Sequence, residues 1–430
     1  MLPAPAAGRH WLSETDTAPT ATWPSVRWSL SFVALLAYLA VIVTYQFTIG
    51  TFVIGAGLAG LVIEPKGIRI PLFWILLLGM LVWGAIGYLS SPWPALVYEP
   101  LEVLWKLTLI ALVAVSVLND RGRIRVFMLA FVLFYALYPA RGALFNFFLG
   151  GYTIYGRAVW NFIYRNPNDL GALTLLLLSM AAGLLVTERN KLTRYAAMVA
   201  VPVLALLVLL TGSRGAFLGL FVFGVLALSG ERRKARLFGV LGAVGLAAVL
   251  LLPQTTWDRF GMLGDLGRGG TAAFEELEDQ GSAEQRFEIW RTAVRIIGDY
   301  PFVGVGLGAY NAANEQYSPH LGRRDTHSTY LRITAEMGFP GLLLFLGMIA
   351  SAVVPAERVR RRLKRIRPHS ARQLYLLELG LLAFLVAGVF ASYGKLTFLY
   401  LHLALIWALA TAQAAELRRA QRADLPRSRR

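Results

Sequence analysis

Cysteine is absent from the 430-residue sequence, and charged residues are scarce. Without cysteine the chain has no disulfide framework, no thiolate nucleophile and no thiolate metal site. Charged residues make up 16% of the sequence, against roughly 25% in soluble globular proteins. Hydrophobic residues reach 57%, and several apolar runs approach the ~18 residues that signal a spanning helix. This balance excludes a soluble fold.

Twelve apolar stretches predict an all-α polytopic membrane protein, because a segment in lipid must satisfy its own backbone hydrogen bonds. We expect the helices at 28–48, 49–63, 71–89, 101–118, 126–148, 170–187, 195–212, 215–230, 237–253, 329–354, 374–393 and 396–415. The polar N-terminal tail, 1–27, has no hydrophobic core and is not interpreted as a cleavable signal peptide. The other expected parts are nine helices in 28–253, an outward loop at 254–327, three helices in 328–415 and a basic tail at 416–430.

The net charge of +17 has two alternative explanations. Either the protein binds nucleic acid, or its basic loops follow the positive-inside rule of membrane proteins. With twelve helices, every dense Lys/Arg cluster falls on one side of the membrane. The clusters are Lys66 with Arg69, Arg121–Arg125, Arg189–Arg194, Arg232–Arg236, Arg358–Arg372 and Arg418–Arg430. This distribution favours the positive-inside rule, so we expect both termini in the cytoplasm, membrane lipids as partners and no nucleic acid.

The long loop at 254–327 reverses this charge balance. It contains eleven of the 25 acidic residues of the chain and only seven basic residues. Loops of this length in compact proteins are usually functional. We therefore expect an outward-facing subdomain that covers one end of the helix bundle.

Arg214 lies in Thr211-Gly212-Ser213-Arg214-Gly215, at the outward end of two apolar stretches. A charge beside hydrocarbon marks a functional site by default, and Ser213 adds a hydroxyl donor. The alternative is an arginine that only anchors the hairpin by snorkelling. Such an anchor is more expected on the cytoplasmic side, so the pattern favours a functional Arg214.

Arg286 opens a predicted amphipathic helix in the long loop. At about 100° per residue it shares a face with Trp290, whereas Arg291 and Arg295 fall on the opposite, polar face. One arginine of three therefore points toward the bundle, where it needs an anionic partner. The alternative is an aliphatic stem packed beneath a solvated head.

The segment Tyr300–Gly308 follows this helix and has glycine at three alternate positions after Pro301. The pattern predicts an extended turn with exposed amides. A Gly-x-Gly-x-Gly sequence without a strand–helix unit does not indicate a nucleotide-binding fold.

His327 stands where the long loop returns to the membrane, in Asp325-Thr326-His327-Ser328-Thr329. Histidine can accept a proton near neutral pH, and Asp325 is placed to orient its ring. The alternative is a simple helix start, in which Ser328 or Thr329 caps the next span.

Further polar groups lie near the same side or within spans. Asn166–Gly171 is a polar turn flanked by Arg157 and Arg165, although most such turns only start helices. The acidic cluster Glu275–Asp279 lacks metal-ligand spacing and is interpreted as a solvated loop. Lys106, Arg141, Glu378 and Lys395 are further ionisable candidates for lining a cavity.

These motifs together resemble the O-antigen ligase and polymerase superfamily of bacterial inner membranes. The resemblance covers roughly residues 110–395 and is carried by Asn166-Pro167-Asn168, Gly212-Ser213-Arg214-Gly215, the series Arg286, Trp290, Pro301, Gly304 and Gly306, and His327-Ser328-x-Tyr330-Leu331. It implies a glycosyltransferase fold of the GT-C kind with a periplasmic cap. It also implies an undecaprenyl-pyrophosphate-linked glycan donor and inverting, metal-independent transfer with no cofactor.

Members of the superfamily differ in their acceptor. Ligases use the lipid A core, polymerases use another repeat unit, and related enzymes glycosylate proteins. The chain length and the single dominant loop favour a ligase acting on the lipid A core. A transporter of lipid-linked sugars would instead show internal repeats and ionisable groups near mid-membrane.

The resemblance also suggests a role for each candidate residue. Arg214 and Arg286 would clamp the pyrophosphate, because guanidinium binds phosphate oxygens bidentately and stays charged. His327 would be the general base, or else would only hydrogen-bond donor or acceptor. The predicted substrate-binding residues are Arg214, Arg286, Ser213, Asn168, Arg157, Arg165 and Tyr330.

Overall fold

The computed structural model describes residues 26–64, 67–229 and 283–423. Its elements are α2 (Leu30–Thr44), α3 (Gly50–Ile63), α4 (Leu72–Ser90), α5 (Pro94–Val117), α6 (Arg121–Tyr135), π-helical η1 (Ala136–Ala140), α7 (Arg141–Phe145), π-helical η2 (Asn146–Gly150), 3₁₀-helical η3 (Phe162–Arg165), α8 (Pro167–Thr187), α9 (Lys191–Leu210), α10 (Arg214–Ser229), α14 (Ala283–Asp299), α15 (Tyr310–Tyr317), α16 (Thr329–Ile366), α17 (Pro368–Ala387) and α18 (Thr397–Ala423). Eight of the described helices are long and apolar enough to cross a membrane, and α2, α3 and α10 are shorter apolar helices. The predicted all-α polytopic class is confirmed.

Most predicted spans coincide with a helix, but several boundaries were wrong. The helix α16 ends at Ile366 rather than at residue 354, and α18 ends at Ala423 rather than at residue 415. The helix α5 begins at Pro94 rather than at residue 101, and α17 covers 368–387 rather than 374–393. Both helices have proline in the first turn, where its missing N–H leaves no hydrogen bond unmade. The loop between α17 and α18, which is predicted to face outward, therefore covers residues 388–396. The predicted span at 237–253 lies outside the described residues, as do residues 1–25 and 424–430 of the two tails and residues 254–282 of the long loop. Residues 416–423 of the predicted basic tail continue α18.

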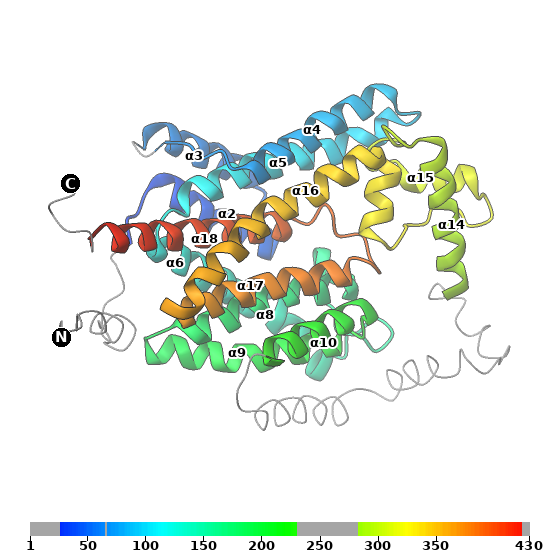
Figure 1. Ribbon diagram of the computed structural model, residues 1–430. Helices are drawn as coiled ribbons and strands as arrows, with labels where there is room; N and C mark the ends of the chain where they lie inside the picture. Colours follow the sequence, from blue (N-terminus) through cyan, green and yellow to red (C-terminus); the bar gives the residue numbers. More distant parts are fainter. Residues whose placement is uncertain (1–25, 65–66, 230–282, 424–430) are drawn as a thin grey trace, which may run out of the picture.

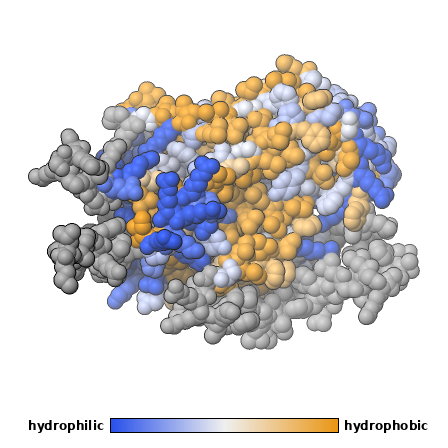
Figure 2. Space-filling model, viewed as in Figure 1, coloured by the Kyte–Doolittle hydropathy of each residue, from blue (hydrophilic) through white to orange (hydrophobic). Residues whose placement is uncertain are grey.

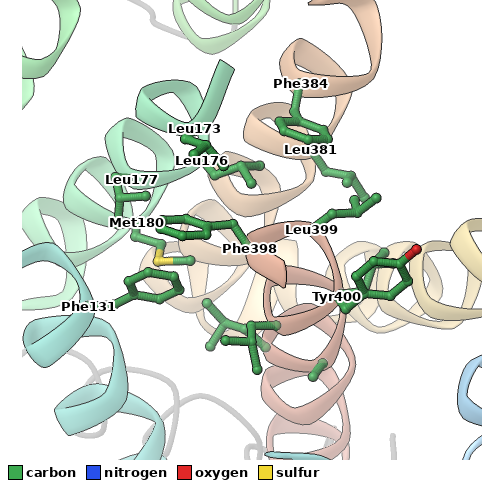
Figure 3. Close-up of a cluster of buried hydrophobic side chains, with 14 of the residues drawn as sticks. Phe131, Leu173, Leu176, Leu177, Met180, Leu381, Phe384, Phe398, Leu399 and Tyr400 are labelled. Carbon is green, nitrogen blue, oxygen red and sulfur yellow. The ribbon is translucent and has the colours of Figure 1, made fainter. Parts of the chain in front are cut away.

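The core lies where α6, α8, α17 and α18 meet. Figure 3 shows Phe131 of α6 and Phe398 of α18 in this cluster, and their ring centroids are 5.0 Å apart. Leu173 and Leu176 of α8 and Phe384 of α17 complete the contact, and all five side chains are fully or almost fully buried. Interdigitated side chains of this kind hold the helices that carry the outward loops.

The basic loops gather at one end of the bundle. Arg125, at the start of α6, makes a bidentate pair with Glu188 after α8, with N–O distances of 2.6 and 2.9 Å. Arg121 and Arg367 both pair with Glu416 of α18. Loops predicted to share the cytoplasmic side are thus tied to one another, at the left of Figure 1, and a broad apolar band separates them from the other end in Figure 2.

The opposite end carries the cap, which we define as α14, α15 and residues 300–309 and 318–328 (Figure 1). The cap rests on the outward loops. Ser91, between α4 and α5, donates its hydroxyl to the Val305 carbonyl at 2.6 Å. Within the cap, Trp290 of α14 donates its indole N–H to the Thr326 carbonyl at 2.8 Å. The loops predicted to face outward therefore share an end with the described part of the long loop.

The cap is joined to α16 at a break in that helix. Gly338 has φ +67° and ψ −175°, which interrupts the helical backbone. The carbonyls of Ala335 and Glu336, which lose their partners at the break, accept the N–H groups of Val305 and Gly306 at 2.9 and 3.0 Å. Irregular backbone at membrane depth needs such replacement partners. The amides that were expected to be exposed in the glycine-rich turn are thus bound to α16, and that prediction was wrong.

The glycines of this turn are required by close packing as well as by conformation. Gly304 has φ +72°, and a Cβ there would lie 2.3 Å from the Glu336 carbonyl carbon. Gly306 has φ +102°, and a Cβ there would lie 2.6 Å from the Ser91 hydroxyl. The turn therefore fixes the cap against both α16 and the α4–α5 loop.

Candidate active site

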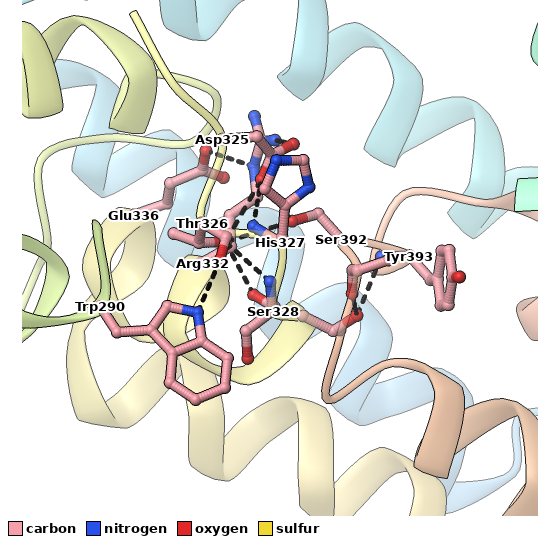
Figure 4. Close-up of polar contacts among 11 residues, drawn as sticks. Trp290, Asp325, Thr326, His327, Ser328, Arg332, Glu336, Ser392 and Tyr393 are labelled. Atoms are coloured by element: carbon pink, nitrogen blue, oxygen red, sulfur yellow. Dashed lines mark hydrogen bonds and ion pairs between the residues drawn. The ribbon is translucent and has the colours of Figure 1, made fainter. Parts of the chain in front are cut away.

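The His327 turn is the last segment of the cap and lies directly before α16 (Figure 4). His327 has φ +47°, in the left-handed region that non-glycine residues seldom adopt. Its backbone N–H donates to Asp325 Oδ1 at 3.1 Å. The preceding Thr326 is fully buried, and its carbonyl accepts the Trp290 indole N–H. The surroundings, rather than local preference, hold this turn in place.

Asp325 is the centre of the polar contacts in Figure 4. Besides the His327 N–H, its carboxylate accepts the Ser392 hydroxyl at 2.6 Å and pairs with Arg332 at 2.7 Å. Burial by itself raises the pKa of Asp325, but Arg332, Ser392 and His327 outweigh it and the net pKa is lowered. Within the described residues no hydrogen bond joins this carboxylate to the His327 ring, so the expected orientation of the ring by Asp325 was wrong.

Arg332 and Glu336 were missed in the sequence. Arg332 Nε also donates to Glu336 Oε1 at 2.9 Å, and the two side chains are only 15% and 5% exposed. Both charges stand four residues apart near the outward end of a predicted span, where an ionisable residue is a functional signal by default. The four-residue spacing of these two charges was therefore the signal in the sequence that could have identified them.

The His327 ring lies in a half-buried, largely cationic environment. Burial lowers the pKa of His327 below its ordinary value of 6.5. Asp325 acts in the opposite direction, whereas Arg286, Arg324 and Arg332 lower the pKa further. A neutral imidazole at physiological pH can accept a proton.

Arg286 reaches this environment from the inward face of α14. Ala293 and Ile297, which share its face, are buried, whereas Arg291 and Arg295 are exposed. The helix-face prediction is therefore confirmed. Burial lowers the pKa of Arg286, and the nearby charge of Arg214 lowers it further.

Arg214 is the first residue of α10 and is exposed. It stands close enough to Arg286 for the two guanidinium groups to repel each other. Among the residues that the structure describes, neither arginine has a carboxylate partner. Guanidinium groups bind anions such as phosphate through charge-assisted hydrogen bonds, so two neighbouring arginines beside a histidine make this place a candidate anion site.

Residues 199–346 match the family model described as O-antigen ligase. This part of the chain is therefore similar to the O-antigen ligase family. The matched residues, here called the matched region, include Arg214, Arg286 and His327. The resemblance inferred from the short motifs is thereby confirmed. None of the curated proteins compared with the chain matches it.

Arg157 and Asn168 lie before the matched region in sequence but beside it in space. Arg157 donates to the Thr211 carbonyl at 2.7 Å and to Asn168 Oδ1 at 2.8 Å. The buried Tyr393 donates its hydroxyl to the Asn168 carbonyl at 2.9 Å and lies within electrostatic reach of Arg286. These contacts connect the polar turn before α8 to the Arg214 loop.

Three other candidates are placed differently. The Ser213 hydroxyl accepts the Ala216 N–H at 3.4 Å and so caps α10. Tyr330 donates its hydroxyl to the Leu385 carbonyl at 2.9 Å. Arg165 is exposed and makes no hydrogen bond or ion pair within the described ranges. Their contacts with substrate stay predictions.

The four ionisable residues that could line a cavity fall in different places. Lys106 pairs with Glu102 at 2.6 Å on the surface of α5, and Arg141 is exposed in α7. Glu378 pairs with Arg360 at the basic end. Lys395 alone lies near the site.

A pocket lies between α4, α5, α16 and the 388–396 loop. Its polar wall includes Arg332, Glu336, Ser392 and Lys395, and the rest is mostly apolar. Within the described residues no three His, Asp or Glu side chains are grouped as metal ligands. The acidic cluster at 275–279 lies outside those residues.

Proposed function

We propose that the chain is an O-antigen ligase. It transfers a polysaccharide from undecaprenyl pyrophosphate to a sugar hydroxyl of the lipid A core, with inversion at the anomeric carbon. The similarity of residues 199–346 to the O-antigen ligase family supports an enzyme acting on a lipid-linked glycan in a membrane. The acceptor and the stereochemistry rest on the resemblance.

The observation that supports this reaction best is the convergence of three segments on one place. Arg214 from α10, Arg286 from α14 and His327 from the loop before α16 lie within electrostatic reach, Arg286 facing both others. A pyrophosphate between the two guanidinium groups would remove their repulsion. The anomeric carbon next to that pyrophosphate would then lie beside the imidazole.

In the proposed reaction the acceptor oxygen attacks the anomeric carbon as the bond to the pyrophosphate oxygen breaks. The two arginines stabilise the charge that grows on the departing pyrophosphate. His327 takes the proton of the attacking hydroxyl. The new glycosidic bond forms on the opposite face of the sugar, which gives inversion.

A deletion strain complemented with the wild-type gene or with Arg214, Arg286 and His327 variants tests the reaction through its lipopolysaccharide. A ligase deletion leaves long chains on the lipid carrier and bare core. A single repeat attached to the core would identify a polymerase, the alternative within the superfamily. Glycan trapped on its carrier on the cytoplasmic side, with ligation lost for lack of donor, would favour a lipid-linked-glycan transporter.

The orientation is a proposal of its own. We place the cap in the periplasm, at the inner membrane of a Gram-negative bacterium, because the basic loops lie at the other end. The absence of cysteine makes the test direct. Single cysteines introduced at Arg323 and at Arg361, both exposed, should react with a membrane-impermeant reagent from opposite sides. Labelling of both from the same side would contradict the orientation.

A further inference from the structure

Arg332, near the start of α16 and close to the His327 turn, forms ion pairs with two carboxylates. Its Nη1 atom lies 2.7 Å from Asp325 Oδ2 and its Nε atom 2.9 Å from Glu336 Oε1. The three side chains are 15%, 31% and 5% exposed for Arg332, Asp325 and Glu336. Removing one member of a buried pair leaves an uncompensated charge. The arrangement is therefore rigid, and Asp325 has little freedom to turn elsewhere.

The other carboxylate oxygen of Asp325, Oδ1, accepts two hydrogen bonds. The donors are the backbone N–H of His327 at 3.1 Å and the Ser392 hydroxyl at 2.6 Å. With Arg332 on one oxygen and these donors on the other, the carboxylate holds His327 at its positive φ without a hydrogen bond to the ring within the described structure. A carboxylate on the ring would favour the imidazolium, which cannot act as a base.

We infer that Arg332 is a positioning residue, which keeps the Asp325 carboxylate on the backbone of His327 and away from its ring. This inference rests on the proposed role of His327 as the base and adds the group that keeps the base neutral and in place. Glu336 completes the arrangement by holding the far side of the guanidinium. The same residue is fixed to the cap, because its carbonyl accepts the Gly306 N–H.

The charged groups around His327 come from several elements. Arg286 faces the ring from α14, Arg332 from α16, and Asp325 and Arg324 from its own loop. Asp169 of α8 lies within electrostatic reach of Asp325 and of Lys395 in the 388–396 loop. Loss of Arg332 removes one cation and releases the nearest anion. Both changes favour a protonated His327, so its pKa should rise.

The test measures the protonation of His327 without relying on turnover. Full-length protein in detergent is treated with diethyl pyrocarbonate, which modifies neutral imidazole, and the modification of each histidine is followed by mass spectrometry across pH. We expect Arg332→Gln to move the His327 midpoint upward by about half to one pH unit, the effect of a charge at short range. Asp325→Asn should move it downward, and the double variant should return it toward wild type.

Matched controls separate positioning from general damage. Arg332→Lys keeps the charge and should keep the midpoint. Arg323→Gln, nine residues earlier in the same loop region and 68% exposed in a pair with Glu315, should behave as wild type. An unchanged midpoint in both Arg332→Gln and Asp325→Asn would overturn the inference. If Arg332→Gln does not fold, the His327 midpoint in Asp325→Asn still tests the inference. A downward shift supports it, and an unchanged midpoint contradicts it.

The transfer rate provides the second readout. In Arg332→Gln the acidic limb of the rate profile should move to higher pH together with the modification midpoint. If the midpoint moves but the rate does not follow it, the positioning of His327 stands and its role as the base fails. A His327→Ala enzyme with normal turnover would remove the base while leaving the modification result intact.

Discussion

The two ends of the molecule are both rich in arginine, yet they use it in opposite ways. At the basic end Arg125, Arg121 and Arg367 are paired with glutamates from other helices. At the cap end Arg214 and Arg286 face each other without a carboxylate among the described residues. An arginine paired across helices ties the fold together. An arginine that faces another arginine destabilises the fold unless a ligand compensates it, so the unpaired arrangement indicates the site.

The largest expected effect on turnover comes from His327 at the cap end. His327→Ala should lower the transfer rate about 10²–10⁴-fold, the typical loss of a general base. Binding of the lipid-linked donor should persist, because both arginines remain. The measurement is transfer by purified enzyme, alongside donor binding. His320→Ala is the control, since His320 is 63% exposed and pairs with Glu288 on the cap surface. Near-normal turnover in the His327 variant would leave catalysis to the arginines alone.

The second-largest expected effect on turnover comes from Arg214, and Arg291 on the exposed face of α14 is its control. Arg214→Lys keeps the charge but loses the planar fork, and the loss of charge-assisted hydrogen bonds of about 1.5–3 kcal/mol should slow transfer about 10- to 100-fold. Arg291→Lys, on the exposed face of α14, should be nearly silent. If Arg291→Lys proves the more damaging change, the assignment of helix faces to function is wrong.

A paired arginine at the basic end should show the reverse behaviour. Arg125→Met leaves Glu188, whose side chain is 0% exposed, without its partner, and breaking a buried pair costs about 3–5 kcal/mol. We expect a lower unfolding midpoint in detergent and nearly unchanged transfer per folded molecule. A large loss of turnover without loss of stability would break the distinction between the two ends.

The pH dependence of the transfer rate tests the protonation state of His327 at the cap end. His327 must be neutral to accept a proton, and its pKa lies below 6.5. Transfer should therefore be nearly constant around neutral pH and fall only as the pH drops below 6.5. The profile of kcat/KM gives the pKa in the free enzyme. An acidic limb centred well above 6.5 would contradict the neutral imidazole.

The smallest expected effect is that of chelation. If Arg214 and Arg286 supply the positive charge, excess EDTA should leave the transfer rate unchanged. The comparison is the same enzyme with added magnesium. Activity that is lost on chelation and restored by magnesium would bring the acidic cluster at 275–279 back into consideration.

The sequence was sufficient for features that depend on local pattern. Apolar length predicted the spans, and the 3.6-residue period placed Arg286 on the buried face of α14. The motifs around Arg214 and His327 predicted residues that the structure brings within electrostatic reach. Each of these features depends on neighbours in the chain.

The features that were missed depend on contacts distant in sequence. The Asp325 carboxylate meets Ser392, 67 residues away, and no periodicity predicts that contact. The amides of Val305 and Gly306 are bound only because α16 is broken at Gly338. Tyr393 reaches Asn168 across 225 residues. A proton acceptor could be proposed from the sequence, but the groups that hold it could not.

The break at Gly338 also bears on how the protein meets bilayers of different thickness. Helices tilt to match the hydrocarbon around them, and a continuous α16 would transmit that tilt to His327. Here the Ala335 and Glu336 carbonyls before the break and the Phe339 N–H after it are hydrogen-bonded to the cap, and the helix then continues to the basic end. We expect tilting of that later part to be absorbed at the break. The geometry between His327 and Arg286, which both belong to the cap, should then depend little on the length of the acyl chains around the bundle.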